Sequence, residues 1–186
     1  MPAAGTAAPT SATGAYLCGF GIGVTDLEAS TKFYKAAFGM TERVRLTRTD
    51  RVEVVLNSAD RRVAQLVLFQ FTDGKVRKVK QNPGKIVFNV KNTQAAVDAF
   101  TAAGSSASAP AEFSGRQVSF GRDPDNNLVE MNSDPTAVAS YFSAAGLGVA
   151  DLEAAKTFYV DVLDMKVAAK LSVAKAPACP GTTNRC

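Results

Sequence analysis

An internal repeat limits the folds available to this chain more than any other feature of its sequence. The segment GIGVTDLEASTKFY at 21–34 returns at 146–159 as GLGVADLEAAKTFY. A fainter copy, VFNVKNTQAAVDAF, lies between them at 87–100. A segment that recurs within one chain indicates a supersecondary unit that is used more than once. The sequence therefore predicts a modular protein.

Each copy has the pattern of a short strand followed by a capped helix. In the first copy the apolar strand ends at Asp26, whose carboxylate can accept hydrogen bonds from the free N–H groups at a helix start. Apolar and small side chains then recur at helical spacing as far as Ala37. Gly39 and, in the second copy, Gly104 stand where a helix commonly ends in the left-handed conformation.

Strand-like runs follow both of these helices. They span 41–47, 52–56 and 63–71 after the first helix and, beyond a loop rich in Ser, Ala and Pro, 117–121 and 128–132 after the second. The turn Asp123-Pro-Asp-Asn-Asn127 joins the last two runs. Pro sets φ at the second position of such a turn, and Asn tolerates the left-handed conformation that follows. The unit is therefore strand, helix and about three strands (βαβββ), and the predicted fold class is α+β.

These units predict how the chain is organised. A disordered leader rich in Ala, Pro, Thr and Gly precedes one domain of two full modules, and the third copy of the repeat opens an incomplete module. The ranges are 1–14 for the leader, 15–134 for the domain with modules at 15–75 and 84–134, 135–142 for a linker, 143–173 for the incomplete module and 174–186 for an irregular tail. Three explanations stay open for the incomplete module. The chain is a fragment or truncated product of a longer tandem protein, the half module docks on the main domain, or two chains join their half modules in a dimer.

Composition excludes several classes of protein. No apolar run approaches the roughly 18 residues that span a bilayer, and residues 1–14 lack the basic start and apolar core of a secretory signal, so a cytoplasmic protein is expected. The net charge of +4 comes partly from a basic stretch, 75–80 and Lys85, which is either a solvated loop or an anion-attracting rim. Because aromatic residues are not interleaved with these charges, nucleic acid is not an expected partner.

Histidine is absent from the chain. Its absence removes the commonest general base and the commonest transition-metal ligand, so histidine-dependent triads and imidazole metal sites are excluded. The three cysteines, Cys18, Cys179 and Cys186, are odd in number and irregularly spaced, and do not predict a disulfide framework.

The chain resembles the vicinal oxygen chelate superfamily in its tandem βαβββ unit and in three local motifs. These motifs are Asp-Leu-Glu-Ala at the helix start, the Phe-Tyr and Gly-Met that follow, and the closing Asp-Pro-Asp-x-x-x-x-Glu. That group includes glyoxalase I, extradiol dioxygenases and the bleomycin and fosfomycin resistance proteins. The resemblance implies that two modules form a strongly curved mixed sheet that cups a ligand, with the helices on the convex side.

The resemblance also places the positions where metal-bearing members hold their ion. The two histidine positions correspond to Gly19 and Lys85, and the acid after the Asp-Pro-Asp turn corresponds to Glu130. The remaining position falls on the strand 63–71, which has neither an acid nor a histidine. One carboxylate cannot hold a divalent cation, because such ions take several oxygen or nitrogen donors. No cofactor is therefore expected here, although active relatives are expected to bind a metal.

Strand alternation extends the candidate site, because residues i and i+2 share one face of a strand. Asn89 is expected beside Lys85, and Asn132 beside Glu130. Val44 and Leu46 are expected to pack against the helix, which turns Arg45 toward the cup, and Gln65 is the favoured inward residue of its strand. The candidate catalytic residue is Glu130, and the candidate ligand-binding residues are Lys85, Asn89, Arg45, Gln65 and Asn132.

We hypothesise that the ammonium group of Lys85 occupies the vacated metal position and pairs with Glu130. The alternatives are that Lys85 points to solvent as part of the basic stretch, and that Glu130 is only a polar residue beside the turn.

Three functions stay open at this point. The first is a metal-independent protein that binds a small amphipathic molecule in the cup. The second is an enzyme of the superfamily, a glyoxalase-like lyase, an isomerase or a dioxygenase, with Glu130 as a base whose pKa an apolar cup could raise. The third is the non-catalytic half of a larger tandem protein. The expected partner is a small molecule and not a membrane, and a homodimer is left open.

Overall fold

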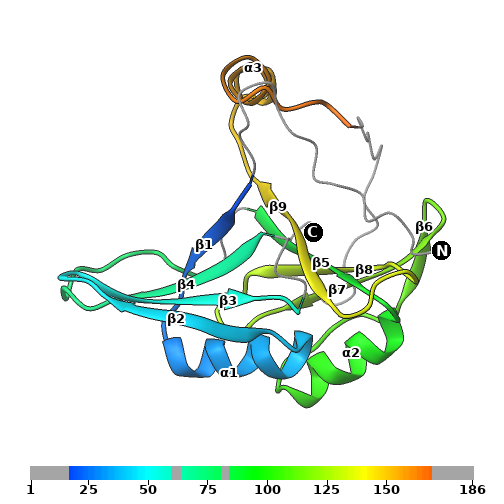
Figure 1. Cartoon of the computed structure of the whole chain (residues 1–186), viewed down its shortest axis with the longest axis horizontal. Helices are drawn as coiled ribbons and strands as arrows, with labels where there is room; N and C mark the ends of the chain where they lie inside the picture. Colours follow the sequence, from blue (N-terminus) through cyan, green and yellow to red (C-terminus); the bar gives the residue numbers. More distant parts are fainter. Residues whose placement is uncertain (1–16, 60–63, 81–83, 169–186) are drawn as a thin grey trace, which may run out of the picture. The chain divides into compact units, whose positions relative to one another are not determined.

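The computed structural model describes residues 17–59, 64–80 and 84–168. One compact unit spans 17–148, and residues 149–168 belong to a second unit. The predicted leader, the predicted tail, Cys179 and Cys186 lie outside the described residues. The predicted α+β class is confirmed (Figure 1). None of the helices within the described ranges is long and apolar enough to cross a membrane.

The first module forms a four-stranded sheet, called sheet 1. Its strands run in the spatial order β1-β4-β3-β2, with β1 parallel to β4 and the other neighbours antiparallel (Figure 1). The elements are β1 (Gly19–Gly23), α1 (Leu27–Phe38), β2 (Thr41–Thr47), β3 (Arg51–Asn57) and β4 (Gln65–Phe71).

The second module repeats this topology and adds one strand. Sheet 2 has the order β6-β7-β8-β5-β9, with β5 parallel to β8. The elements are β5 (Gly84–Val90), α2 (Thr93–Ala102), β6 (Ala111–Phe113), β7 (Arg116–Arg122), β8 (Leu128–Ser133) and β9 (Tyr141–Leu147). The short strand β6 lies in the Ser-, Ala- and Pro-rich segment that the sequence predicts as a loop. Among the described strands the two sheets share no hydrogen-bonded pair, and a single curved cup stays a prediction.

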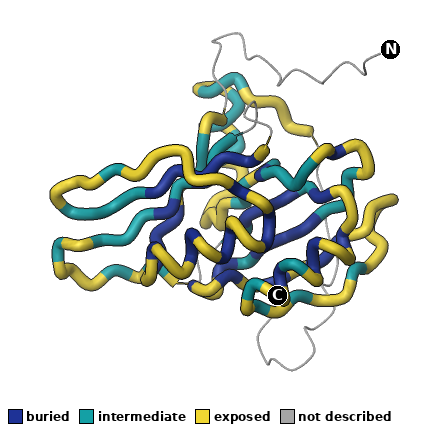
Figure 2. The backbone as a smooth tube through the Cα atoms, turned by 60° about the horizontal axis from the view of Figure 1, so that its bottom comes forward, coloured by how far each residue is buried: buried dark blue, intermediate teal, exposed yellow. Residues whose placement is uncertain are grey.

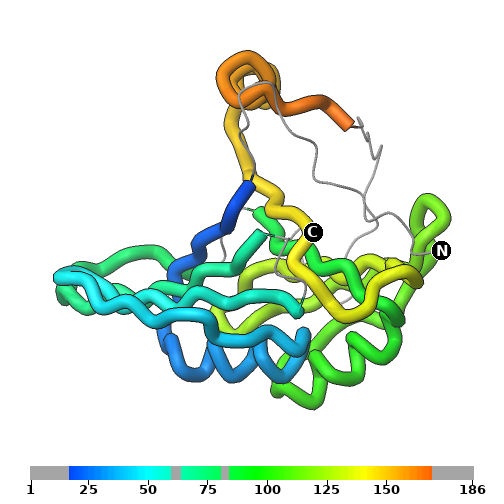
Figure 3. The backbone as a smooth tube through the Cα atoms, in the orientation of Figure 1, coloured from blue at the N-terminus to red at the C-terminus, as the bar shows by residue number. Residues whose placement is uncertain are grey.

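The added strand β9 is the opening strand of the third repeat copy. It pairs antiparallel with β5, so Figure 3 shows the chain returning in β9 to lie beside β5. It begins at Tyr141, so the last two residues of the segment predicted as a linker, 135–142, belong to this strand. The edge of β5 is therefore covered, whereas β1, its counterpart in the first module, is the end strand of sheet 1.

Side-chain caps begin the helices at the predicted residues. The carboxylate of Asp26 accepts a hydrogen bond from the N–H of Ala29 (3.0 Å), and Asn92 caps α2 in the same way. Gly39 ends α1 with a φ of 65°, a conformation that a side chain would strain. These helices thus begin, and α1 ends, at residues whose backbone and capping chemistry favour a helix end.

Phenylalanine rings from both modules form one shared core within the unit 17–148. Phe38 of α1 stacks on Phe88 of β5 with a centroid distance of 3.8 Å, and Phe88 also meets Phe142 of β9. Phe33 meets Phe100 of α2 edge to face at 4.9 Å. Figure 2 shows buried backbone in both the helices and the strands of this unit. Truncating one such buried ring costs about 3–5 kcal/mol, so the two modules depend on each other for stability.

The helix of the third copy has a different environment from α1. Helix α3 (Leu152–Thr157) starts at Asp151 and continues as a π-helical turn, Phe158–Val162. Phe158 is 51% exposed, whereas its counterpart Phe33 in α1 is 2% exposed. The same local sequence therefore forms a helix in both places, and only α1 has its apolar face packed within the described residues.

Candidate functional site

The face of sheet 2 that lies opposite its buried core carries most of the predicted site. Ile86, Phe88, Val129 and Met131 point into the core and are at most 2% exposed. Strand alternation therefore turns the residues between them to the other side, which we call the outer face of sheet 2. The strand registers arrange that face in rows, namely Arg122–Leu128–Lys85–Gly146, Phe120–Glu130–Val87–Ala144 and Val118–Asn132–Asn89–Tyr141.

Glu130 is the central charged group of the outer face. The ammonium of Lys85 forms an ion pair with Oε2 of Glu130, and Asn132 Nδ2 donates a hydrogen bond to Oε1 at 3.0 Å. Both carboxylate oxygens therefore have protein donors. The expected pair between Lys85 and Glu130 is present, and both residues project from neighbouring parallel strands.

The two members of this ion pair differ in their access to solvent. The Glu130 side chain is 12% exposed, and the Lys85 side chain is 43% exposed. An ammonium group carries three N–H donors, so Lys85 retains donors beyond the one used on Glu130. The carboxylate is thus held in place from within the protein, and the ammonium is the part of the pair that a second molecule can reach.

A second polar chain lies beside the first on the same face. Asn89 Nδ2 donates to the Tyr141 hydroxyl at 2.8 Å, and that hydroxyl donates to Asp134 at 2.9 Å. Ser143 Oγ lies 3.3 Å from Asn89 Oδ1. Burial, followed by the neighbouring Asp134, raises the pKa of Tyr141. The side chain of Asn89 is therefore fixed by Tyr141 and Ser143 of β9, the opening strand of the third repeat copy.

Sequence reasoning missed Tyr141 and Ser143. Both lie on or beside the opening strand of the third copy, and only the pairing of β9 with β5 brings them to Asn89. The one local signal was the repeat itself, because the first strand of the second copy carries Lys85 and Asn89.

Gln65 and Gly19 are neighbours on sheet 1. They stand opposite each other in the β1–β4 register, on the side away from the fully buried Leu66 and Leu68. This agrees with the predicted inward orientation of Gln65, although the described hydrogen bonds do not join it to Lys85 or Glu130.

Arg45 does not take its predicted orientation. Its guanidinium pairs with Glu28 of α1 at 2.5 Å and with Glu42 at 3.1 Å, which places it on the helix side of sheet 1. A β-bulge between Glu42 and Val44 shifts the register by one residue and sets Arg45 opposite the buried Val54. Because such a slip exchanges the two faces of a strand, the predicted alternation is wrong here.

The Asp-Pro-Asp turn contains two buried carboxylates that reach across to the first module. Asp125 accepts hydrogen bonds from the backbone N–H of Thr25 (3.1 Å), its hydroxyl (2.6 Å) and the hydroxyl of Ser30 (3.3 Å). Asp123 accepts from the Tyr34 hydroxyl at 2.7 Å. We call these contacts the inter-module latch. Burial raises the pKa of Asp123 and raises the pKa of Tyr34 well above its usual value.

The residues at the Glu130 centre do not fit a divalent metal ion. Both oxygens of Glu130 already accept bonds from Lys85 and Asn132, Lys85 is itself a cation, and Gly19 has no side chain to donate. Across the described ranges, no group of three or more His, Cys, Asp or Glu side chains is placed to hold a metal. A divalent ion needs several such donors at once.

Comparisons with known proteins identify the fold independently. Residues 17–131 match the family model described as the glyoxalase/bleomycin resistance protein/dioxygenase superfamily. No curated protein sequence matches the chain.

Three solved structures illustrate the structural likeness. Glyoxalase I from Zea mays is 19% identical, with a TM-score of 0.70 over 85% of this chain and 58% of the maize chain. A glyoxylase/bleomycin resistance protein/dioxygenase domain from a Frankia species is 18% identical, with a TM-score of 0.52 over 64% of this chain and 97% of its own. An antibiotic-binding protein from a Streptomyces species is 15% identical, with a TM-score of 0.53 over 64% and 95%.

At these identities the structural likeness establishes the fold and not the activity. The family model, in contrast, covers more than half of the chain and ends one residue beyond Glu130. It therefore includes nearly all of both βαβββ modules, the inter-module latch and the Lys85–Glu130 pair. The chain belongs to the glyoxalase/bleomycin resistance protein/dioxygenase superfamily.

Proposed function

We propose that this protein binds a small amphipathic molecule on the outer face of sheet 2 and does so without a divalent metal. The observation that carries this proposal is the ion pair between Lys85 and Glu130. Metal-bearing relatives place ligands at both positions, and here a cation supplied by the protein neutralises the one carboxylate that is retained.

The composition of the face supports an amphipathic ligand. Lys85 can donate to a ligand oxygen through an N–H that Glu130 does not use. Around this polar centre lie Val87, Ala144 and Phe120, and the Phe120 ring is 45% exposed. An exposed aromatic ring beside a fixed polar group is typical of sites that bind an apolar body and orient it by a few hydrogen bonds. The antibiotic-binding relative gives a precedent for binding on this fold.

The first experiment is a thermal-shift screen of the chelator-treated protein against hydrophobic antibiotics and thiol conjugates. At least one compound is expected to raise the melting temperature in the presence of EDTA. For that compound, Lys85→Met should weaken binding about tenfold, which corresponds to about 1.4 kcal/mol. Lys32→Met is the matched control, because it removes the same charge from an exposed position on α1.

Two results would overturn the proposal. One is an equal affinity of Lys85→Met and Lys32→Met for the compound, because the ammonium of Lys85 would then not contact the ligand. The other is a stoichiometric metal in the purified protein that is lost in Glu130→Ala, because Glu130 would then be a metal ligand.

A further inference from the structure

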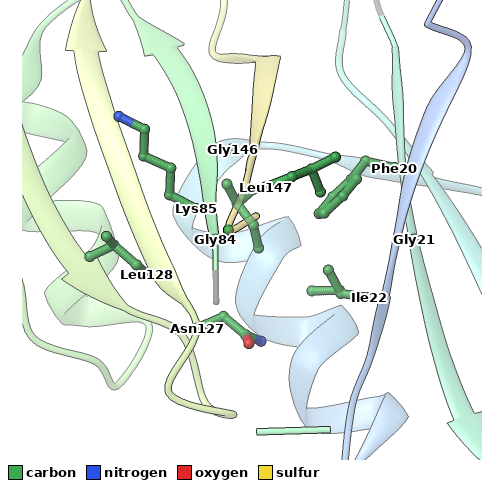
Figure 4. A pocket seen from close by; sticks show the side chains of 11 residues that line it. Phe20, Gly21, Ile22, Gly84, Lys85, Asn127, Leu128, Gly146 and Leu147 are labelled. Carbon is green, nitrogen blue, oxygen red and sulfur yellow. The ribbon is translucent and has the colours of Figure 1, made fainter. Parts of the chain in front are cut away.

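A cleft of about 250 Å³ lies between β1 of sheet 1 and the β5–β9 pair of sheet 2, and it meets the outer face of sheet 2 at Lys85, Leu128 and Gly146 (Figure 4). Five apolar side chains and four glycines form most of its lining, and Lys85 and Asn127 complete it. The residues that carry the argument are Phe20, Gly21, Ile22, Ile86, Leu128 and Leu147. This cleft is formed within the compact unit 17–148.

The cleft presents a neutral interior. Lys85 is its one charged lining residue among those described, and Figure 4 shows the ammonium turned away from Phe20, Ile22 and Leu147. The ion pair with Glu130 accounts for this direction, because it holds the ammonium over β8. A charged ligand would lose its hydration in this cleft without gaining an opposite charge, which is costly. The electrostatics therefore favour a neutral ligand.

β1 is an end strand of sheet 1 among the described strands, and its outer edge adds hydrogen-bonding capacity to this wall. The N–H of Gln65 donates to Cys18 O, and the N–H of Val24 donates to Phe69 O. In a parallel pair of strands, the backbone N–H and C=O groups of every second residue point to the same neighbouring strand. Those of Phe20 and Ile22 therefore point to β4, and those of Gly21 point away from β4. Gly21 lines the cleft, and it can do so only through backbone atoms. The outer edge of such a strand presents a backbone N–H donor and a backbone C=O acceptor to a ligand.

We propose that this cleft is a second binding site, which takes a neutral ligand of one or two rings that carries a hydroxyl, carbonyl or amide group. A cavity of about 150 Å³ lined by apolar side chains accepts benzene, so a volume of about 250 Å³ is adequate for a somewhat larger ring system. The apolar walls hold the rings, and the polar group of the ligand pairs with the backbone edge of β1. This site differs from the outer face of sheet 2 in preferring a neutral molecule.

The test compares 2-naphthol with 2-naphthoate, which has the same rings but carries a charge, by isothermal titration calorimetry. The intact chain is expected to bind 2-naphthol at least tenfold more tightly than 2-naphthoate. Leu147→Trp should weaken 2-naphthol binding at least tenfold, because the indole fills the cleft. Leu147 is 54% exposed, so this change is compatible with folding. Leu152→Trp is the matched control at another exposed leucine and should leave binding within twofold.

Phe120→Ala separates this site from the proposed function, because Phe120 is an exposed residue of the outer face that does not line the cleft, and the change should leave 2-naphthol binding within twofold. The inference is wrong if 2-naphthoate binds as tightly as 2-naphthol, if Leu147→Trp binds like the unaltered chain, or if Phe120→Ala abolishes binding. If the antibiotic screen fails but 2-naphthol still binds in a way that depends on Leu147, the proposed function is rejected and the inference about the cleft stands.

Discussion

The two halves of the Asp-Pro-Asp-x-x-x-x-Glu motif lie close together in sequence and serve different purposes. Asp125 is 1% exposed, and the described donors to its carboxylate belong to the first module. Glu130 has its partner Lys85 on the adjacent strand, and that lysine is nearly half exposed. The turn thus joins two modules, whereas the strand that follows presents a polar centre to solvent.

The hydrogen-bond partners thus distinguish a carboxylate that the fold encloses from a carboxylate that lies beside a solvent-accessible donor. Buried acids are tolerated when donors within the protein satisfy them, and the donors of Asp125 come from Thr25 and Ser30. A ligand cannot reach these oxygens without opening the modules. At Glu130 the partner Lys85 retains unused donors, so a ligand can join the centre while the ion pair stays intact.

The largest expected effect comes from breaking the inter-module latch. Asp125→Ala leaves the Thr25 amide and two hydroxyls without their acceptor, and should lower the free energy of unfolding by about 3 kcal/mol. Urea denaturation followed by circular dichroism measures this loss. Asp98→Ala is the control, because Asp98 is exposed on α2 and its loss should change stability by about 0.5 kcal/mol or less. Equal effects of both variants would contradict a structural role for the turn.

A smaller effect is expected from Tyr34→Phe, and it should depend on pH. Loss of the hydrogen bond to Asp123 should cost about 1.5 kcal/mol at neutral pH. Because the pKa of Tyr34 in the folded protein is raised above its ordinary value of 10.0, the folded state keeps a proton that the unfolded state loses. The advantage of the unaltered chain over Tyr34→Phe is therefore fully present below pH 10 and shrinks as the pH rises above it.

Denaturation of both proteins at a series of pH values from 7 to 11 measures the change in this difference. A difference that is constant, or that grows above pH 10, would show that the tyrosine proton is not retained by folding.

The smallest expected effect concerns the ion pair of the outer face. Lys85→Met leaves Glu130 with Asn132 alone, and should cost about 1 kcal/mol because the lysine is well hydrated before it is removed. The double variant Lys85→Met/Glu130→Gln should recover most of this loss. A double-mutant cycle measures the coupling, and single effects that add within about 0.3 kcal/mol would argue against an interaction of any consequence.

Local sequence signals predicted most of the fold and part of the site. Asp26, Asn92 and Asp151 begin helices, and alternation along single strands placed Lys85 with Asn89 and Glu130 with Asn132. These predictions succeed because capping and alternation depend on residues only a few positions apart.

The failures involve partners that are distant in sequence. The bulge in β2 depends on how β2 aligns with β3, so Arg45 could not be oriented from its own strand. The contact between Tyr141 and Asn89 depends on the pairing of β9 with β5. Asp123 and Asp125 are buried because their turn packs against α1. The sequence of the turn does not predict this packing.

The sequence by itself determined the repeated βαβββ unit, the residues that begin its helices, and the polar residues that share one face of β5 and of β8, because each follows from local backbone chemistry and side-chain periodicity. The tertiary structure decided which carboxylates are buried, which face of each strand meets the core, and that β9 supplies Tyr141 to the site. Those outcomes depend on strand register and on the packing of one module against the other, and a single residue of slip or one different neighbour changes them.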